Sequence, residues 1–468
     1  MLLDQLLGGV EVLDVRGDPN STDVAAITHD SRAVVPGSLF CCVPGAHVDG
    51  HEFAADAVAA GAVALLDERV VALEVTQVVV PEARAAMAPV AAAFFGHPSR
   101  DLQVVGVTGT NGKTTTVHLL GAIFEAAGKR AGAIGTLTGE RTTPEAPELQ
   151  AQLASFRREG ATAVAMEVSS HALALHRADA VWFSVAVFTN LSQDHLDFHE
   201  TMEEYFAAKV RLFDPARAAV GVVNVDDPHG RLLFESAPVP MVPYSLADAQ
   251  DLRVGPTMST FRWRGGDVRL GLGGRVNVAN ALAAATAAHE LGIGSLDVAR
   301  GLSSAGPVPG RYEAIDAGQP FAVLVDYAHT PDGLEQVLRS VRETVRGRVL
   351  VVFGAGGDRD REKRPAMGEV ATRLADEAVL TSDNPRSEDP ASIIDAVRGG
   401  AHTAGLLHIE PDRRTAISYA MSRAVGGDVV VIAGKGHETT QQFADKAVPF
   451  DDRAVARDEL ARMGWARP

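Results

Sequence analysis

A short glycine loop between an apolar run and a helix-forming run constrains this chain more than any other feature. Residues Val104 to Thr116 read VVGVTGTNGKTTT, so a hydrophobic strand leads into the loop and Lys113-Thr114 opens a helix. Glycines allow backbone N–H groups to converge on phosphate oxygens, and the helix N-terminus adds the positive end of its dipole. The pattern therefore predicts a loop that binds the phosphates of a nucleotide.

Within this loop, the Lys113 ammonium is expected to neutralise the β- and γ-phosphates, and the Thr114 hydroxyl to bind Mg²⁺. The spacing is the short GxxGK[ST] form, because Val107 stands where GxxxxGK[ST] has its first glycine. Motors, kinases and ligases all use such a loop, so it does not decide the reaction. The residues expected to bind ATP here are Gly109, Thr110, Asn111, Gly112, Lys113, Thr114 and Thr115.

Short apolar runs alternate with helical runs along the whole chain. Its 468 residues are too many for one core, and turn-rich stretches lie at Gly96 to Ser99 and at Gly306 to Gly310. We predict an α/β fold of three domains, residues 1–98, 99–309 and 310–468, with a doubly wound parallel sheet in the central one. The predicted strands are Leu39 to Val43, Ala62 to Leu66, Val78 to Val80, Gln103 to Val107, Ala163 to Met166, Ser184 to Phe188, Val220 to Val225, Phe321 to Val325, Val349 to Phe353, Ala378 to Thr381 and Val429 to Ala433.

Composition excludes several classes of protein. The net charge of −17 disfavours a nucleic-acid-binding protein, which would carry a basic face. The two cysteines, Cys41 and Cys42, are neighbours, so we expect reduced, packed thiols and neither a disulfide framework nor a thiolate metal site. Charges interrupt every apolar stretch, and the N-terminus lacks a basic segment. We expect a cytoplasmic monomer that does not enter a membrane.

Further motifs resemble the Mur ligase family and follow the family's order across almost the whole chain. The resemblance implies a small N-terminal domain that binds a UDP-linked substrate, a central ATPase domain and a C-terminal Rossmann-like domain. It also implies a ligase that converts a carboxylate to an acyl phosphate with ATP and then joins it to an amino acid. These motifs are MEVSSHAL at Met166 to Leu173, FTNLSQDHLDFH at Phe188 to His199, YFAAKVRLF at Tyr205 to Phe213, DYAHTPDGL at Asp326 to Leu334 and AGKGHE at Ala433 to Glu438.

The expected catalytic residues are acidic and basic side chains around the loop. Glu167 ends a buried-type strand, where it and Thr114 would give Mg²⁺ two hard oxygen ligands. The resemblance implies that His195 holds a second Mg²⁺ and that Lys209 is carbamylated, which needs a desolvated amine of lowered pKa. The alternatives are a structural role for His195 and a solvated side chain for Lys209. His199 is expected to be structural. The catalytic set is Lys113, Glu167, His195 and Lys209, and the metal set is Thr114, Glu167, His195 and carbamylated Lys209.

The resemblance also assigns the substrate and the outer nucleotide contacts. Its nearest branch adds the third amino acid of the peptidoglycan stem peptide to UDP-MurNAc-L-Ala-D-Glu. Leu175 departs from the pattern, since relatives carry glutamine there. Asn280 could instead be a helix cap and Asp326 a strand-end turn. The expected UDP-substrate contacts are Ser31, Thr142, Thr143, Ser169 and Arg177, and the outer ATP contacts are Asn280, Arg311, Asp326 and His329.

The sequence DNPR at Asp383 to Arg386 matches members that add meso-diaminopimelate. Diaminopimelate has a distal carboxylate that lysine lacks, and a guanidinium can bind it bidentately. The alternative amino acids are L-lysine and L-ornithine. The alternative role of Arg386 is to cap a surface loop. The full set expected to bind the amino acid is Arg359, Asp383, Asn384, Pro385, Arg386, Gly434 and Glu438.

Two other proteins could explain the loop. A folylpolyglutamate synthetase shares the ligase core but lacks a separate N-terminal UDP domain, so the first hundred residues argue against it. A regulatory protein that hydrolyses little ATP accounts for the loop, but not for Glu167, His195 and Lys209 together.

Overall fold

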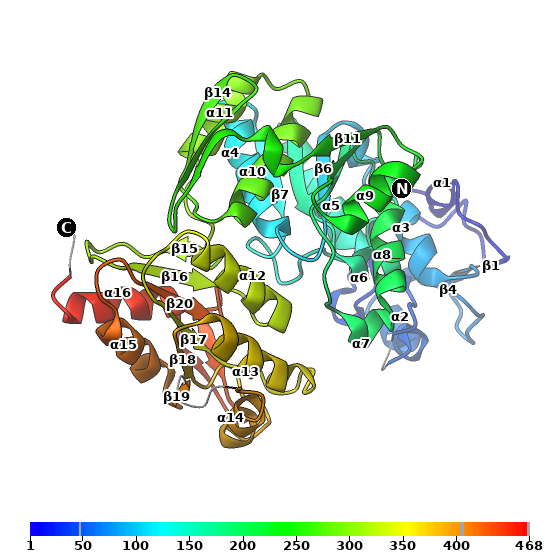
Figure 1. Ribbon diagram of the computed structural model, residues 1–468. Coiled ribbons are helices and arrows are strands. Elements are labelled where there is room, and N and C mark those ends of the chain that lie inside the picture. The colour runs from blue at the N-terminus through cyan, green and yellow to red at the C-terminus, as the bar shows by residue number, and fades with distance from the viewer. Residues whose placement is uncertain (46–47, 403–406, 466–468) are drawn as a thin grey trace.

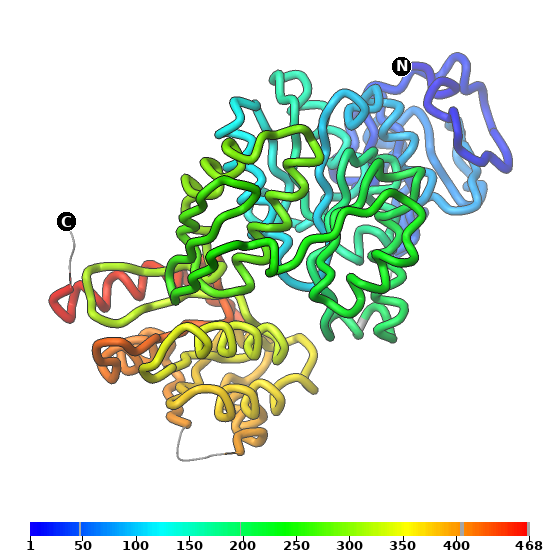
Figure 2. The backbone as a smooth tube through the Cα atoms, turned by 45° about the horizontal axis from the view of Figure 1, so that its top comes forward, coloured from blue at the N-terminus to red at the C-terminus, as the bar shows by residue number. Residues whose placement is uncertain are grey.

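The computed structural model describes residues 1–45, 48–402 and 407–465. They form three α/β units, with the N-terminal and C-terminal units at opposite ends of the central one (Figures 1 and 2). Each predicted strand overlaps a strand of the structure. Among the described helices, none is both long and apolar enough to cross a membrane.

The central unit is built on a six-stranded sheet in the order β11-β10-β9-β6-β8-β7, and every pairing in it is parallel. This confirms the predicted doubly wound sheet. The chain leaves β6 toward β8 and β7 on one side and later reaches β9 on the other, so the loop after β6 lies where the strand order reverses. The strands are β6 (Gln103–Thr108), β7 (Ala131–Ile134), β8 (Ala163–Glu167), β9 (Val185–Phe188), β10 (Gly221–Asn224) and β11 (Met241–Tyr244).

Helices on both faces of this sheet position the site. The alanine-rich α10 packs on α4, and its small buried side chains permit the close approach. The helices are α4 (Lys113–Ala126), α5 (Ala146–Arg158), α6 (Ser170–Ala174), α7 (Leu196–His199), α8 (Met202–Val210), α9 (Pro228–Ser236), α10 (Arg275–Glu290) and α11 (Ser295–Ser304).

A small antiparallel sheet that the sequence analysis missed completes the central unit. It joins β12 (Gln250–Val254), β13 (Ser259–Trp263) and β14 (Gly266–Leu270), and β14 packs against α11. Its inner side chains, Phe261, Trp263 and Val268, enter the same core as α4 and α10. The sheet therefore covers the helical layer on the side away from the parallel strands.

The N-terminal unit has five strands in the order β1-β5-β4-β3-β2, all parallel except β1. Cys41 and Cys42 are buried free thiols, as predicted. The elements are α1 (Leu3–Leu6), β1 (Asp14–Arg16), β2 (Ala26–Thr28), the 3-10 helix η1 (Ser31–Ala33), β3 (Ser38–Cys41), η2 (Gly50–Phe53), α2 (Ala54–Ala59), β4 (Ala62–Asp67), β5 (Thr76–Val79) and α3 (Ala83–Phe94).

The C-terminal unit has six strands in the order β15-β16-β20-β17-β18-β19, all parallel except β15. A hairpin of β21 (Thr440–Gln442) and β22 (Ala447–Pro449) follows β20, and the sequence analysis missed it. The other elements are β15 (Glu313–Ala314), β16 (Ala322–Asp326), α12 (Pro331–Arg342), β17 (Val349–Phe353), α13 (Lys363–Leu374), β18 (Glu377–Leu380), α14 (Pro390–Arg398), β19 (Leu407–Ile409), α15 (Arg413–Arg423), β20 (Val429–Ala433) and α16 (Asp452–Arg462).

A substitution at Gly106, in the middle of β6, tests the packing beneath the glycine loop. A Cβ there would lie 2.6 Å from the buried Phe183 ring, so Gly106→Ala should destabilise the protein by about 1–3 kcal/mol. Gly121→Ala is the control, because nothing lies within 4 Å of its Cβ in α4. It should leave stability unchanged or raise it by up to about 1 kcal/mol. Equal denaturant midpoints for the two variants would contradict the packing of β6.

Candidate active site

The glycine loop adopts a conformation that only glycine tolerates at two positions. Gly109 has φ +145° and Gly112 has φ +87°. A Cβ would lie 1.9 Å from Thr189 Oγ1 at Gly109 and 2.3 Å from Asn280 Oδ1 at Gly112. Asn280 lies within α10 and faces the loop, so the alternative of a helix cap is wrong. The backbone is thus left free for close approach by phosphate, which fits ATP.

Two lysine side chains donate to one carbonyl oxygen of the loop. Lys113 Nζ and Lys209 Nζ each lie 2.9 Å from Gly109 O, and Lys113 also donates to Thr110 O at 2.8 Å. Lys209 is buried, and its ammonium lies 4.3 Å from the centre of the Tyr205 ring. Burial and the Lys113 charge hold the pKa of Lys209 well below its usual range, and burial also lowers the pKa of Lys113. The alternative of a solvated Lys209 is wrong.

Glu167 ends β8 beside the first turn of α4. Its carboxylate accepts from Thr114 Oγ1 at 3.0 Å and from the Thr136 backbone N–H at 2.8 Å, and it is 1% exposed. Hydroxyl and carboxylate oxygens in contact fit a Mg²⁺ ion that completes its shell with phosphate and water. In the described part of the chain, no three His, Cys, Asp or Glu residues are grouped as a metal site.

The other two predicted metal ligands make different contacts. His195 has φ +56°, and its side chain is 44% exposed, with Nε2 lying 3.5 Å from Asp194 Oδ2. Lys209 contacts Gly109 and Tyr205, as described above. The structure therefore joins Thr114 to Glu167 directly, while metal binding by His195 and Lys209 stays a prediction.

Most of the predicted UDP-substrate residues are linked to Glu167. The Thr143 hydroxyl donates to Glu167 O at 3.0 Å and accepts from the Ser169 N–H at 3.1 Å, and Arg177 Nη1 donates to Thr143 O at 3.3 Å. Thr142 Oγ1 lies 3.0 Å from the hydroxyl of Thr136, and the backbone N–H of Thr136 donates to the Glu167 carboxylate. The remaining predicted residue, Ser31, lies in η1 of the N-terminal unit. Leu175, the departure from the family pattern, is the C-cap of α6.

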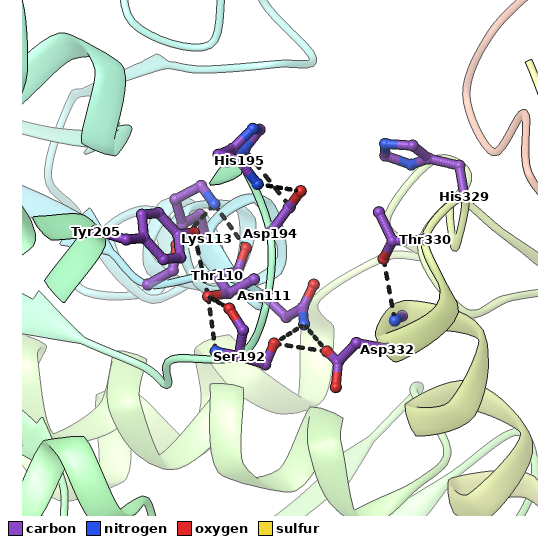
Figure 3. A network of polar contacts seen from close by, with 12 residues as sticks. Thr110, Asn111, Lys113, Ser192, Asp194, His195, Tyr205, His329, Thr330 and Asp332 are labelled. Carbon is purple, nitrogen blue, oxygen red and sulfur yellow. Dashed lines mark hydrogen bonds and ion pairs between the residues drawn. The ribbon is translucent and has the colours of Figure 1, made fainter. Parts of the chain in front are cut away.

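A polar bridge ties the C-terminal unit to the glycine loop (Figure 3). The Asp332 carboxylate, in the first turn of α12, accepts from Asn111 Nδ2 at 3.3 Å and from Ser192 Oγ at 2.5 Å. Asn111 Nδ2 also donates to Gln336 Oε1 at 3.2 Å. The sequence analysis did not single out Ser192, Asp332 or Gln336, although the first two stand inside motifs it quoted. Burial raises the pKa of Asp332.

Arg311, Asp326 and His329 gather around Tyr327 at the start of the C-terminal unit. The Arg311 guanidinium lies 4.4 Å from the centre of the Tyr327 ring, and the His329 ring lies 4.6 Å from it. Asp326 accepts from the backbone N–H groups of Tyr312 at 2.7 Å and Ala328 at 2.8 Å. Asp326 thus serves a strand-end turn, the structural alternative, and its contact with nucleotide stays a prediction. Burial raises the pKa of Asp326 and lowers that of His329.

The residues expected to bind the amino acid meet where β18 and β20 end. Asn384 Nδ2 donates to Glu438 Oε2 at 2.7 Å, and a Cβ at Gly434 would lie 2.4 Å from Asp383 Oδ2. Lys435, which the sequence analysis missed, is fully buried between them. Its ammonium donates to Asn384 Oδ1 at 2.9 Å, Thr440 O at 2.6 Å and Glu438 Oε2 at 3.3 Å. A buried cation therefore fixes two of the predicted contacts.

Arg386 follows Pro385 and holds a left-handed backbone, with φ +51°. Its guanidinium donates to Gly357 O at 2.6 Å and to Gln442 Oε1 at 3.3 Å. It lines an open cavity of about 400 Å³ with residues of the β21–β22 hairpin, including Lys446. Arg359 is exposed, and a Cβ at Gly356 would lie 3.0 Å from Arg386 Nη1 and 3.9 Å from Arg359 Cγ. The two contacts of the Arg386 guanidinium fit the loop-capping alternative, and binding of the amino acid by Arg386 stays a prediction.

Comparison with known proteins covers the whole chain. Residues 23–103 match the Mur ligase family catalytic domain, residues 107–288 the Mur ligase middle domain, and residues 310–436 the glutamate ligase domain of Mur ligases. The UDP-N-acetylmuramoyl-L-alanyl-D-glutamate–2,6-diaminopimelate ligase of Streptomyces coelicolor is 47% identical over 96% of this chain and 95% of its own. A solved structure of a ligase of the same name is 33% identical, with a TM-score of 0.69 over 97% of this chain and 98% of that one.

The alternative ligase, folylpolyglutamate synthetase, is similar to this chain in fold alone. Folylpolyglutamate synthase of Mycobacterium tuberculosis is 18% identical, with a TM-score of 0.59 over 81% of this chain and 94% of its own. Identity that low carries the architecture and no more, whereas the Streptomyces coelicolor ligase is 47% identical over 96% of this chain.

Gly112→Ala should weaken ATP binding by at least about 30-fold, because the added methyl group collides with Asn280 and distorts the phosphate loop. Gly128→Ala is the matched control, since Gly128 also has positive φ, +70°, but no neighbour within 4 Å. Calorimetric titration of both folded variants with ATP separates collision from backbone strain. Equal affinities would contradict the assignment of this loop to nucleotide.

Proposed function

The chain belongs to the Mur ligase family, and from this we infer that it is an ATP-dependent ligase that adds meso-diaminopimelate to UDP-MurNAc-L-Ala-D-Glu in peptidoglycan precursor synthesis. The observation that carries the proposal is the lysine pair on Gly109 O, Lys113 and the buried Lys209, beside the Thr114–Glu167 contact. Cations crowded at a phosphate loop suit a reaction in which two anions must meet. We also place the reaction in the cytoplasm, where ATP is supplied.

In the first step, an oxygen of the substrate carboxylate attacks the γ-phosphorus of ATP, and ADP leaves. An acyl phosphate forms, so the carboxylate gains a leaving group. Lys113 offsets negative charge on the transferring phosphoryl group, since its ammonium lies at the loop that would hold the phosphates. Thr114 and Glu167 would hold Mg²⁺, which supplies further positive charge at the phosphates.

In the second step, the amine of the incoming amino acid attacks the acyl carbon and phosphate leaves. The amine gives up a proton as the amide forms. The C-terminal unit would bring this amino acid to the acyl phosphate, and the Asp332 bridge to Asn111 and Ser192 supports that placement. A site that closes between two units also limits attack by water on the acyl phosphate.

Carbamylation of Lys209 has physical support. Reaction of its amine with CO₂ releases a proton and needs the neutral form, and burial beside Lys113 lowers the pKa so that this form is available. The product is an anion that the neighbouring Lys113 cation would stabilise. It would convert a repulsive pair of lysines into an attractive one.

The choice of diaminopimelate rests on Arg386 and the Asn384–Glu438 pair. The guanidinium at the cavity suits the distal carboxylate, and the Glu438 carboxylate suits the distal ammonium. L-Lysine and L-ornithine have no distal carboxylate, so they would leave Arg386 facing an empty pocket. Glutamate, which folylpolyglutamate synthesis adds, has a distal carboxylate but no distal ammonium to meet Glu438.

Lys209→Ala should lower kcat by at least about 100-fold, because it removes a charge from the reacting centre. Short organic acids such as formate should partly restore activity by replacing the lost carbamate. Lys129→Ala, a lysine on the far side of α4 that pairs with Gln103, is the control. The measurement is ADP release that depends on both the UDP substrate and diaminopimelate. Wild-type activity in Lys209→Ala would refute the carbamate.

Arg386→Ala should lower kcat/KM for diaminopimelate by about 30-fold or more, while KM for ATP and the UDP substrate changes little. Once the amino acid covers the cavity, a charge-assisted pair there contributes roughly 2–5 kcal/mol on truncation. The control is Arg398→Ala, an exposed arginine of α14 paired with Asp395. A wild type that prefers L-lysine or L-ornithine would refute the choice of amino acid and leave the ligase reaction standing.

A further inference from the structure

Three arginines from separate segments meet one buried carboxylate at the junction of the N-terminal and central units. Glu145, directly before α5, has a side chain 5% exposed. It lies 3.0 Å from Arg84 Nη1, 3.1 Å from Arg141 Nη1 and 2.8 Å from Arg177 Nη2. Arg84 comes from α3, which packs against α5 across the junction.

The charges of this cluster do not balance. Three guanidinium groups contact a single carboxylate, so two positive charges lack a partner in the cluster. Burial lowers the pKa of Arg177, and repulsion from Arg141 and Arg84 lowers it further. Arg177 Nε is a buried donor without a hydrogen-bond acceptor among the described residues. Since a buried N–H without an acceptor is costly, the cluster is suited to receive an anion.

The cluster is joined directly to the reacting centre. Arg177 Nη1 donates to Thr143 O, and the Thr143 hydroxyl donates to the backbone oxygen of Glu167. Arg141, whose side chain is 55% exposed, precedes Thr142 and can reach a ligand from the open side. The carboxylate of Glu145 keeps the three side chains together without neutralising them.

We propose that Arg84 and Arg141 join Arg177 in an anion site, held by Glu145, that binds an acidic group of the UDP-muramoyl peptide. The proposal rests on the proposed function and adds two specificity-determining residues to it, one of them from the N-terminal unit. The acidic group is either the free α-carboxylate of the D-glutamyl residue or the diphosphate, both of which a guanidinium fork binds well.

The test compares Arg141→Gln with Arg158→Gln, an exposed arginine of α5 that changes the net charge equally. Arg141→Gln should weaken binding of UDP-MurNAc-L-Ala-D-Glu about tenfold by calorimetry, with ATP affinity unchanged, whereas Arg158→Gln should bind as the wild type does. Arg84→Gln should act in the same direction as Arg141→Gln. A thermal melt of each variant confirms that it is folded.

Two further ligands identify the acidic group. If it is the α-carboxylate, the analogue with an α-carboxamide should bind wild type and Arg141→Gln alike, and so should UDP alone. If it is the diphosphate, Arg141→Gln should weaken both ligands. Equal substrate affinity in Arg141→Gln and Arg158→Gln overturns the anion site and leaves the ligase reaction intact. A wild type that neither binds nor turns over the UDP-muramoyl dipeptide overturns both.

Discussion

Two ammonium groups on one carbonyl oxygen, Gly109 O, form the interaction on which the rest of the central unit depends. Lysines that are buried together repel each other, and one backbone oxygen offsets only part of that repulsion. The arrangement persists because α4 and α8 are anchored by their own packing, and because glycine lets the loop run close to Thr189 and Asn280. The fold therefore holds two desolvated lysine side chains where phosphates would lie.

The flanking units reach this centre through polar contacts. The C-terminal unit reaches it through Asp332, and the N-terminal unit contributes Arg84 to the cluster around Glu145. Polar interfaces between domains exchange hydrogen bonds with water at small net cost, whereas a large apolar interface would fix the units in place. Such contacts suit an enzyme that must admit two substrates and ATP and then exclude water from the acyl phosphate.

The sequence predicted the sheets well wherever strands were continuous apolar runs, such as Val349–Phe353 and Val429–Ala433, which are buried on both faces. It missed β13 (Ser259–Trp263), where alternation of buried and exposed residues was present but lay among polar neighbours. The phosphate loop and the position of Glu167 followed from the pattern of strand, loop and helix. The partners of Asp332 and the burial of Lys435 could not follow, because they depend on contacts between residues far apart in sequence.

Basic side chains that are at least partly removed from solvent recur in all three units. Lys113 and Lys209 share a carbonyl in the central unit, Arg84 joins two other arginines on one carboxylate, and Lys435 lies between Asn384 and Glu438. A fold optimised for stability alone would replace such groups with apolar side chains, since burying a charge is costly unless its partners are complete. In the proposed function, these positions match the charges of the substrates: positive at ATP and at the acidic groups of the UDP-linked peptide, and mixed where a zwitterionic amino acid would enter. The phosphate loop would then lie between the group that holds the carboxylate substrate and the group that holds the incoming amine.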